Sequence, residues 1–197
     1  MGLILASKSA SRKKILENTG LSFETKPAPI DEQSIKEEML STGDNVRNIA
    51  ERLASEKALY VLKDHPEDFI LGADQILSCD GHLFSKARDK NEAKEHLEFF
   101  RGKKHTLTTS IVLAKADKII WVYTCEPELT MRDFSEAFLN DYMEKAGDAL
   151  IHSVGCYYME DIGIQLFSEI KGEYYDILGL PLLPLLKKLR DLKIIND

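Results

Sequence analysis

The stretch LGADQILSCDGHLFSKA, residues 71–87, carries the feature on which the predicted fold depends. It begins in an apolar strand, predicted over residues 69–78, and turns back at residues 80–81. An acidic residue, Asp74, stands inside this strand, although carboxylates are rarely buried without a partner because desolvation is costly. Asp74 could instead end the strand and cap a turn. Since residues 76–77 continue the apolar pattern, we interpret Asp74 as a functional residue that faces a site.

Apolar patterning outside this stretch predicts further strands and helices. Residues 2–6 predict a buried strand, and the Ser-rich turn after them leads into a helix that ends at Gly20. A long helix is predicted from a cap at Asp44 to about Lys63, because apolar residues recur there at helical spacing. Further strands are expected at 22–26, 105–114 and 118–131, and further helices at 91–100, 134–146 and 180–192. This order predicts a mixed α/β sheet with helices packed on it.

Length, charge and cysteine content limit the class of protein. The 197 residues are expected to form one domain, 1–197, or two small lobes that share a cleft. A net charge of −7 argues against a broad nucleic-acid-binding face, because phosphate backbones need clustered Lys and Arg. No apolar run approaches the ~20 residues that span a membrane, and the N-terminal apolar stretch precedes its charges, unlike a signal peptide. The three separated cysteines indicate neither a disulfide framework nor a zinc site, so we expect a cytoplasmic protein.

The segment LASKSASRKKIL, residues 5–16, places hydroxyls and basic residues where a strand passes into a helix. Backbone N–H groups at a helix N-terminus favour an anion, Ser7 adds a hydroxyl, and Arg12 adds a fork suited to phosphate oxygens. The alternative is that Ser9 caps a surface helix and the basic residues are solvated, which is the commoner case. Taken singly, Glu32 and Lys57 are also more often solvated charges, although Lys57 lies near the apolar face of its helix.

Taken together and in this order, these segments resemble the Maf family of nucleotide pyrophosphatases over nearly the whole chain. The matching segments are LASKSASR (5–12), IDE (30–32), LASEKA (53–58), GADQ (72–75), SKA (85–87), FFRGKKHTLTT (99–109), GCYYMEDIGIQLF (155–167) and ILGLPLLPLL (177–186). Two departures stand out, because Ala10 and Ala87 replace prolines that are typical of the family. They affect the rigidity of the first turn and the direction of Lys86, but they remove no reacting group.

The resemblance implies a fold similar to the inosine triphosphate pyrophosphatases: a long curved mixed sheet flanked by helices, with two lobes and a central cleft. It implies hydrolysis of a nucleoside triphosphate to the monophosphate and pyrophosphate, with Mg²⁺ or Mn²⁺ as cofactor. By position, Asp74 would be the general base that activates water, and Glu32 would hold the metal together with Asp74. The phosphates, whose charge needs a metal and cations, would be surrounded by Ser7, Arg12, Lys57 and Lys86.

Three positions, Ser11, Gln75 and Glu160, resemble the branch of the family that prefers 7-methyl-GTP. The branch that prefers dTTP and UTP typically has Arg, Thr and Gln there. A carboxylate at Glu160 suits the donor edge of guanine, and N7-methylation strengthens that charge-assisted pair. The expected reaction is 7-methyl-GTP to 7-methyl-GMP, which would remove modified nucleotides from the pool. The alternatives are a dTTP/UTP pyrophosphatase, or a nucleotide-binding regulator of cell division without turnover. Similar proteins are often dimers, so a homodimer is expected.

Overall fold

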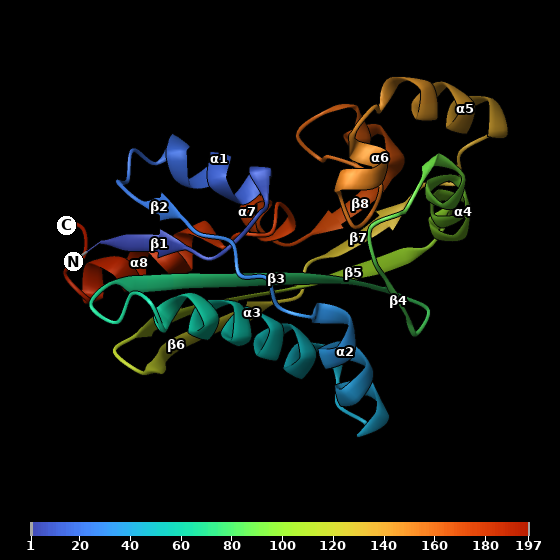
Figure 1. Cartoon of the computed structure of the whole chain (residues 1–197). Coiled ribbons are helices and arrows are strands. Elements are labelled where there is room, and N and C mark those ends of the chain that lie inside the picture. The colour runs from blue at the N-terminus through green and yellow to red at the C-terminus, as the bar shows by residue number, and fades with distance from the viewer. Residues whose placement is uncertain (1, 197) are drawn as a thin grey trace. The chain divides into compact units, whose positions relative to one another are not determined.

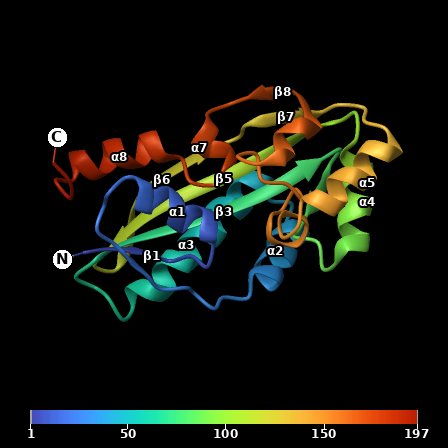
Figure 2. The same cartoon turned by 90° about the horizontal axis from the view of Figure 1, so that it is seen from above.

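The computed structural model describes residues 2–196, and its strands form one mixed sheet in the order β2-β1-β3-β5-β7-β8. Strand β4 pairs with β3, and β6 pairs with β5. The strands are β1 (Leu3–Leu5), β2 (Glu24–Thr25), β3 (Phe69–Cys79), β4 (His82–Phe84), β5 (Lys104–Lys115), β6 (Lys118–Cys125), β7 (Glu128–Met131) and β8 (Phe167–Lys171). The helices are α1 (Ala10–Asn18), α2 (Glu32–Ser41), α3 (Val46–Leu62), α4 (Lys90–Phe100), α5 (Glu136–Lys145), α6 (Ala149–His152), η1 (Ile162–Leu166), α7 (Tyr174–Ile177) and α8 (Leu182–Asp191). Helices flank the strands, which confirms the predicted α/β class (Figures 1 and 2).

The chain divides into two compact units. Unit 1 comprises residues 1–75, 109–125 and 174–197, and unit 2 comprises residues 76–108 and 126–173. Strands β3 and β5 therefore contribute residues to both units. Within residues 2–196 no helix has the length and apolar character needed to cross a lipid bilayer.

In unit 1, β1 and the adjoining parts of β3 and β5 are buried on both faces, and alternate side chains face the two sides of the sheet. Leu71 and Ala73 of β3 belong to one apolar cluster, which also contains buried side chains of α1 and α8. Ile70 belongs to a second cluster, which contains buried side chains of α3 instead. By the same alternation Asp74 faces α3, whereas Gln75 faces the side of α1 and α8. The two neighbours in sequence thus serve opposite faces of the sheet.

Close packing of α3 on β3 depends on a glycine. A Cβ atom at Gly72 would lie 2.1 Å from the carbonyl oxygen of Ala54 and 2.9 Å from Cβ of Ala58, which no real side chain tolerates. The missing side chain lets the helix backbone approach the strand directly. Lys57 lies between these two alanines in sequence, so the contact at Gly72 brings Lys57 close to Asp74.

Unit 2 contains a hairpin, part of the sheet, and the helices α4, α5, α6 and η1. Strand β3 pairs with β4 around the turn at residues 80–81, as predicted from the sequence. Strand β7 pairs with both β5 and β8, and α4 contacts α5 and α6. The buried side chains of this unit include Leu97, Phe100 and Leu129.

The predicted ends of most strands and helices lie within two residues of the observed ends. Two of the differences have a physical cause. The strand expected over 118–131 is two strands, β6 and β7, because the chain leaves the ladder at Glu126 and Pro127, and proline has no N–H to donate. The cap of α3 is Asn45, not Asp44. The Asn45 side chain accepts a hydrogen bond from the Asn48 N–H, whereas Asp44 accepts from the Asn48 side-chain amide.

Candidate active site

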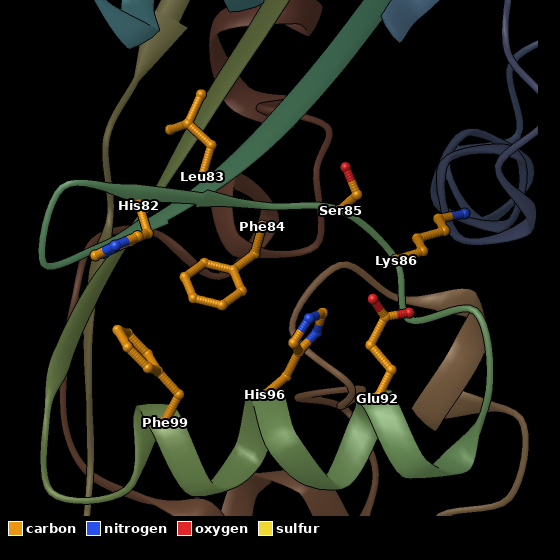
Figure 3. Close-up of a pocket in the computed structure, with 8 residues that line it drawn as sticks. All are labelled: His82, Leu83, Phe84, Ser85, Lys86, Glu92, His96 and Phe99. Carbon is orange, nitrogen blue, oxygen red and sulfur yellow. The ribbon is translucent and has the colours of Figure 1, made fainter.

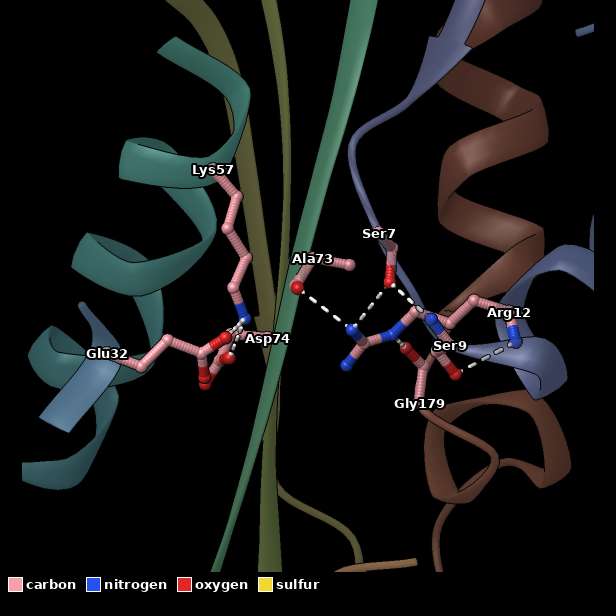
Figure 4. A network of polar contacts seen from close by, with 8 residues as sticks. All are labelled: Ser7, Ser9, Arg12, Glu32, Lys57, Ala73, Asp74 and Gly179. Carbon is pink, nitrogen blue, oxygen red and sulfur yellow. Dashed lines mark hydrogen bonds and ion pairs between the residues drawn. The ribbon is translucent and has the colours of Figure 1, made fainter. Parts of the chain in front are cut away.

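Three charged side chains meet on the α3 face of β3 in unit 1. The ammonium of Lys57, on α3, lies 2.6 Å from Oδ1 of Asp74 on β3 and 2.9 Å from Oε1 of Glu32 at the start of α2. Figure 4 shows all three side chains on one side of β3, converging on the lysine nitrogen. The structure thus brings together three of the residues that the sequence analysis assigned to one site. One lysine therefore holds two carboxylates together.

The two carboxylate oxygens of Asp74 differ in their contacts. Its side chain is 6% exposed, and Oδ1 is engaged by Lys57. The other oxygen, Oδ2, is buried and has no hydrogen-bond partner among the described residues. A buried polar atom without a partner costs free energy and indicates a functional or ligand-binding role. Oδ2 can accept a proton or contact a cation.

Glu32 is positioned by the N-terminal cap of α2. The preceding residue, Asp31, accepts a hydrogen bond from the Ser34 N–H and so fixes the first turn of the helix. Burial alone would raise the pKa of Glu32, but the charges of Lys57, Lys36 and Arg12 and the hydrogen bond from Lys57 lower its pKa below the ordinary value. Glu32 therefore stays ionised at neutral pH.

Arg12 lies on the opposite side of β3, buried against the backbone (Figure 4). Its Nε donates to the carbonyl oxygen of Gly179 at 2.8 Å, and Nη1 donates to that of Ala73 at 2.9 Å and to Oγ of Ser7 at 3.4 Å. Burial lowers the pKa of Arg12, opposed by the charges of Asp74 and Glu32. Nη2 makes no hydrogen bond to a described residue, so this nitrogen is available to an anion.

The two interpretations of the basic N-terminal segment each hold for different residues. Ser9 caps α1, because its hydroxyl accepts from the Arg12 N–H at 3.3 Å. Lys13 and Lys14 are exposed. Ser7 is buried and accepts hydrogen bonds from Arg12 and from the Ser9 N–H. Arg12 and Ser7 are therefore built into the fold, whereas the lysines are solvated.

The proposed specificity residues lie in different parts of the fold. Gln75 is half-buried on β3 in unit 1, and its amide donates to Thr109 and to the backbone at residues 176 and 177. Ser11 is half-buried in the first turn of α1. Glu160 is exposed in a turn that precedes η1 of unit 2. Only Gln75 and Ser11 thus belong to the same unit as Asp74.

Lys86 follows β4 in unit 2 and lines a pocket of about 440 Å³ between β4 and α4. Figure 3 shows Phe84 from the strand pointing toward His96 and Phe99 from the helix, with Glu92 near the lysine end. The rings of Phe84 and His96 pack edge to face at 5.1 Å between centroids. This hairpin places Lys86 at the rim of an aromatic pocket.

Three partners of these residues were missed by sequence reasoning. Gly179 and Ala73 contribute only backbone carbonyl oxygens, and the residue type does not indicate which carbonyl oxygen accepts a hydrogen bond. Thr109 ends the segment FFRGKKHTLTT, but its hydroxyl gave no signal of its contact with Gln75. Gly179 adopts φ +88°, a conformation that favours glycine, so the glycine within segment 177–186 was the one sequence signal of a special backbone position there.

The residues present fit a hard divalent cation such as Mg²⁺. Mg²⁺ is usually held by one or two carboxylates together with waters and substrate phosphates, not by a protein cage. Asp74, with its unpartnered Oδ2, and the ionised Glu32 form such a pair across Lys57. The described residues contain no cluster of three or more His, Cys, Asp or Glu side chains that could hold a metal alone. The donor set thus suits a metal that arrives with an anionic substrate.

Known proteins resemble this chain over nearly its full length. A protein from Granulibacter bethesdensis named nucleoside triphosphate pyrophosphatase is 46% identical over 190 residues, which cover 96% of each chain. Two proteins named 7-methyl-GTP pyrophosphatase, from Rhizobium meliloti and Brucella suis, are each 40% identical over 194 residues, covering 98% of each chain. The family described as Maf-like protein matches residues 2–192. On these grounds, and in agreement with its motifs, the chain belongs to the Maf-like protein family.

Proposed function

We propose that this protein hydrolyses nucleoside triphosphates to the nucleoside monophosphate and pyrophosphate at the Asp74 site, with a divalent metal. The observation that carries the proposal is the unpartnered Oδ2 of a buried carboxylate, held beside Lys57 and Glu32. A general base needs an acceptor atom in a fixed position, and Oδ2 of Asp74 is such an atom. The names of the relatives support the same reaction.

The charge of the site supports a requirement for metal. The formal charges of Asp74 and Glu32 cancel those of Lys57 and Arg12, so these four residues offer a triphosphate no net positive charge. A triphosphate carries about four negative charges, which a divalent ion bound with it offsets. When bound, the ion would be held by Asp74 and Glu32, and it would neutralise charge on the phosphate oxygens.

In the proposed reaction a water molecule gives a proton to Oδ2 of Asp74 while its oxygen forms a bond to the α-phosphorus. The bond between that phosphorus and the α–β bridging oxygen breaks, and pyrophosphate leaves with the electron pair. Lys57 holds Asp74 in place through Oδ1, and Nη2 of Arg12 is oriented by the bonds of Nε and Nη1. Fixed geometry of this kind contributes to catalysis because it needs no reorganisation during the reaction.

The preferred substrate in this proposal is 7-methyl-GTP. Gln75 and Glu160 match the residues typical of that branch, and two relatives carry the name 7-methyl-GTP pyrophosphatase. A cationic 7-methylguanine favours a nearby carboxylate more than a neutral uracil does, because the pair is charge-assisted. Glu160 is exposed and therefore accessible to a ligand.

The experiment is pyrophosphate release with Mg²⁺ or Mn²⁺ from 7-methyl-GTP, GTP, dTTP, UTP, CTP and ATP. The proposal predicts release of pyrophosphate and monophosphate in equal amounts, fastest from 7-methyl-GTP. A preference for dTTP and UTP would support the proposed reaction but would show that 7-methyl-GTP is not the preferred substrate. No release from any nucleotide by folded protein would overturn the reaction and favour a nucleotide-binding regulator. Loss of release in excess chelator, restored by added Mg²⁺, tests the metal.

A further inference from the structure

The segment of residues 174–179 is fixed to unit 1 by two polar side chains on neighbouring strands. The Gln75 amide donates to Thr109 Oγ1 at 2.8 Å, to the carbonyl oxygen of Ile177 at 3.1 Å and to that of Asp176 at 3.3 Å. The Thr109 hydroxyl in turn donates to the Asp176 carbonyl at 3.1 Å. Thr109 is fully buried, so water does not compete for these bonds.

Arg12 also fixes the end of the segment. Its Nε donates to the carbonyl oxygen of Gly179, and its Nη1 to that of Ala73 (Figure 4). A Cβ at Gly179 would lie 3.4 Å from Oε1 of Gln75, so the segment packs directly on that side chain. Ala73 and Gln75, the residues on either side of Asp74, are thus both connected to residues 176–179. The position of the segment is coupled to the strand that carries Asp74.

Two exposed tyrosines belong to this fixed segment. Tyr174 is 47% exposed and Tyr175 is 36% exposed, and their rings meet edge to face at 5.4 Å between centroids. In the described part of unit 1, the only other Phe, Tyr or Trp with comparable exposure is Tyr60 on α3. Tyr60 lies one helical turn beyond Lys57, which bonds to Asp74 from the α3 side of the strand. Tyr174 and Tyr175 instead belong to the segment that Gln75 and Arg12 hold through its backbone carbonyl oxygens.

We propose that Tyr174 and Tyr175 form the surface on which the nucleobase of the substrate stacks, and that Gln75 and Thr109 are positioning residues for it. This inference rests on the proposed function and extends it to the base. Aromatic side chains bind bases of any sequence through their π-faces, and stacking is stronger when the ring is held rigidly. Gln75 then influences the choice of nucleotide through the segment, without touching the base.

The proposal separates binding of the base from binding of the phosphates. A residue that stacks on the base contributes to the affinity for a nucleotide but not for inorganic triphosphate, which has no base. A residue that merely stabilises the fold, or that binds phosphate, affects both ligands. The ratio of the two affinities therefore reports the role of this segment specifically.

The test is isothermal titration calorimetry with two probes, α,β-methylene GTP and inorganic triphosphate, both with Mg²⁺. The variants are Tyr174→Ala, Tyr175→Ala and Thr109→Val, which removes the hydroxyl at nearly constant shape. Thr109→Ser keeps the hydroxyl and should rescue binding. Ser110→Ala is the matched control, because Ser110 is equally buried on β5 but bonds to Thr124. Tyr60→Ala is the control for an exposed tyrosine.

We expect the Kd for α,β-methylene GTP to rise about ten-fold in at least one tyrosine variant and about five-fold in Thr109→Val. The Kd for inorganic triphosphate should stay within about two-fold, and the two controls and Thr109→Ser should resemble wild type. Unchanged nucleotide affinity in both tyrosine variants would show that the base does not stack on Tyr174 or Tyr175, whether or not Thr109→Val folds. Equal losses for both probes in Thr109→Val would overturn its positioning role.

The same experiment separates this inference from the proposed function. If wild type binds the analogue but releases no pyrophosphate from any nucleotide, the proposed reaction is wrong, and the affinities still decide the role of the segment. If wild type binds inorganic triphosphate and the analogue with equal affinity, the base makes no contact, and the inference is wrong even for an active enzyme.

Discussion

The ammonium of Lys57 lies 2.6 Å from Oδ1 of Asp74, and the two side chains are only 10% and 6% exposed. The same ammonium lies 2.9 Å from Glu32, whose side chain is 44% exposed. A buried ion pair depends on both partners, because removal of one leaves a buried charge without compensation. Lys57 is therefore the residue that keeps the two carboxylates together.

Replacing Lys57 with Met should destabilise the protein strongly. The change keeps most of the side-chain volume but leaves the Asp74 carboxylate buried without its partner, which costs about 3 kcal/mol or more. For a chain of this size the corresponding fall in Tm is roughly 6–12 °C. Thermal denaturation followed by circular dichroism measures it. Lys14→Met, at an exposed position, should change Tm little.

A double variant makes this test specific. Lys57→Met combined with Asp74→Asn removes both charges, so part of the lost stability should return. If Lys57→Met alone melts at the wild-type temperature, the ion pair between Lys57 and Asp74 contributes nothing to stability.

Glu32→Gln should raise the Mg²⁺ concentration needed for half-maximal pyrophosphate release. Glu32 is one of two carboxylates in the predicted metal pair, and even loss of an outer partner of a metal lowers affinity about ten-fold. Glu38→Gln, an exposed substitution on the same helix, is the control. If the Mg²⁺ titration of Glu32→Gln superimposes on that of wild type, Glu32 does not bind the metal.

The stability of the protein should fall below pH 6.5 because of His105. Burial lowers the pKa of His105 to about 4, and its Nδ1 has no partner among the described residues. Between pH 6.5 and about 4 the unfolded chain binds a proton at this residue that the folded protein does not. The contribution of neutral His105 to the free energy of unfolding is therefore complete above pH 6.5. It is lost as the pH falls toward 4, by up to about 3 kcal/mol.

Urea denaturation at pH 7.5 and 5 measures this dependence. His105→Gln should lose less stability between these pH values than wild type, although it is less stable at both because of its lost contact with Tyr157. His152→Gln, at an exposed histidine, should retain the wild-type dependence. An equal pH dependence in His105→Gln would show that another group titrates.

Glu160→Gln should lower kcat/KM for 7-methyl-GTP more than kcat/KM for UTP. The carboxylate is expected to accept from the cationic base in a charge-assisted pair, whereas a uracil edge offers a single imide donor. The measurement is kcat/KM for both nucleotides in wild type and variant. Equal losses for the two substrates would show that Glu160 does not read the base.

The sheet and the acidic site follow from local patterns that the sequence displays. Residues of β3 alternate between the α3 face and the opposite face, and Asp74 interrupts an otherwise apolar pattern. Lys57 could be placed near it only through family resemblance, because spacing along a helix does not specify which strand the helix meets. The contact at Gly72 fixes that choice, and it is visible only in three dimensions.

Other features could not be predicted because their partners are backbone atoms. Of the two alternatives for the segment around Ser9, solvated basic residues are right for Lys13 and Lys14 but wrong for Arg12, which is buried on the carbonyl oxygens of Ala73 and Gly179. The cap of α3 was assigned one residue early for a similar reason. Asp and Asn cap equally well, and the choice between them depends on backbone geometry.

Asp74→Asn shows whether Asp74 accepts the proton of the attacking water. The variant keeps the shape of the side chain but removes its basic oxygen. We predict pyrophosphate release from 7-methyl-GTP at least about a hundred-fold slower than wild type. Calorimetry with α,β-methylene GTP should show that nucleotide binding is retained. Release at the wild-type rate by Asp74→Asn would show that Asp74 is not the general base.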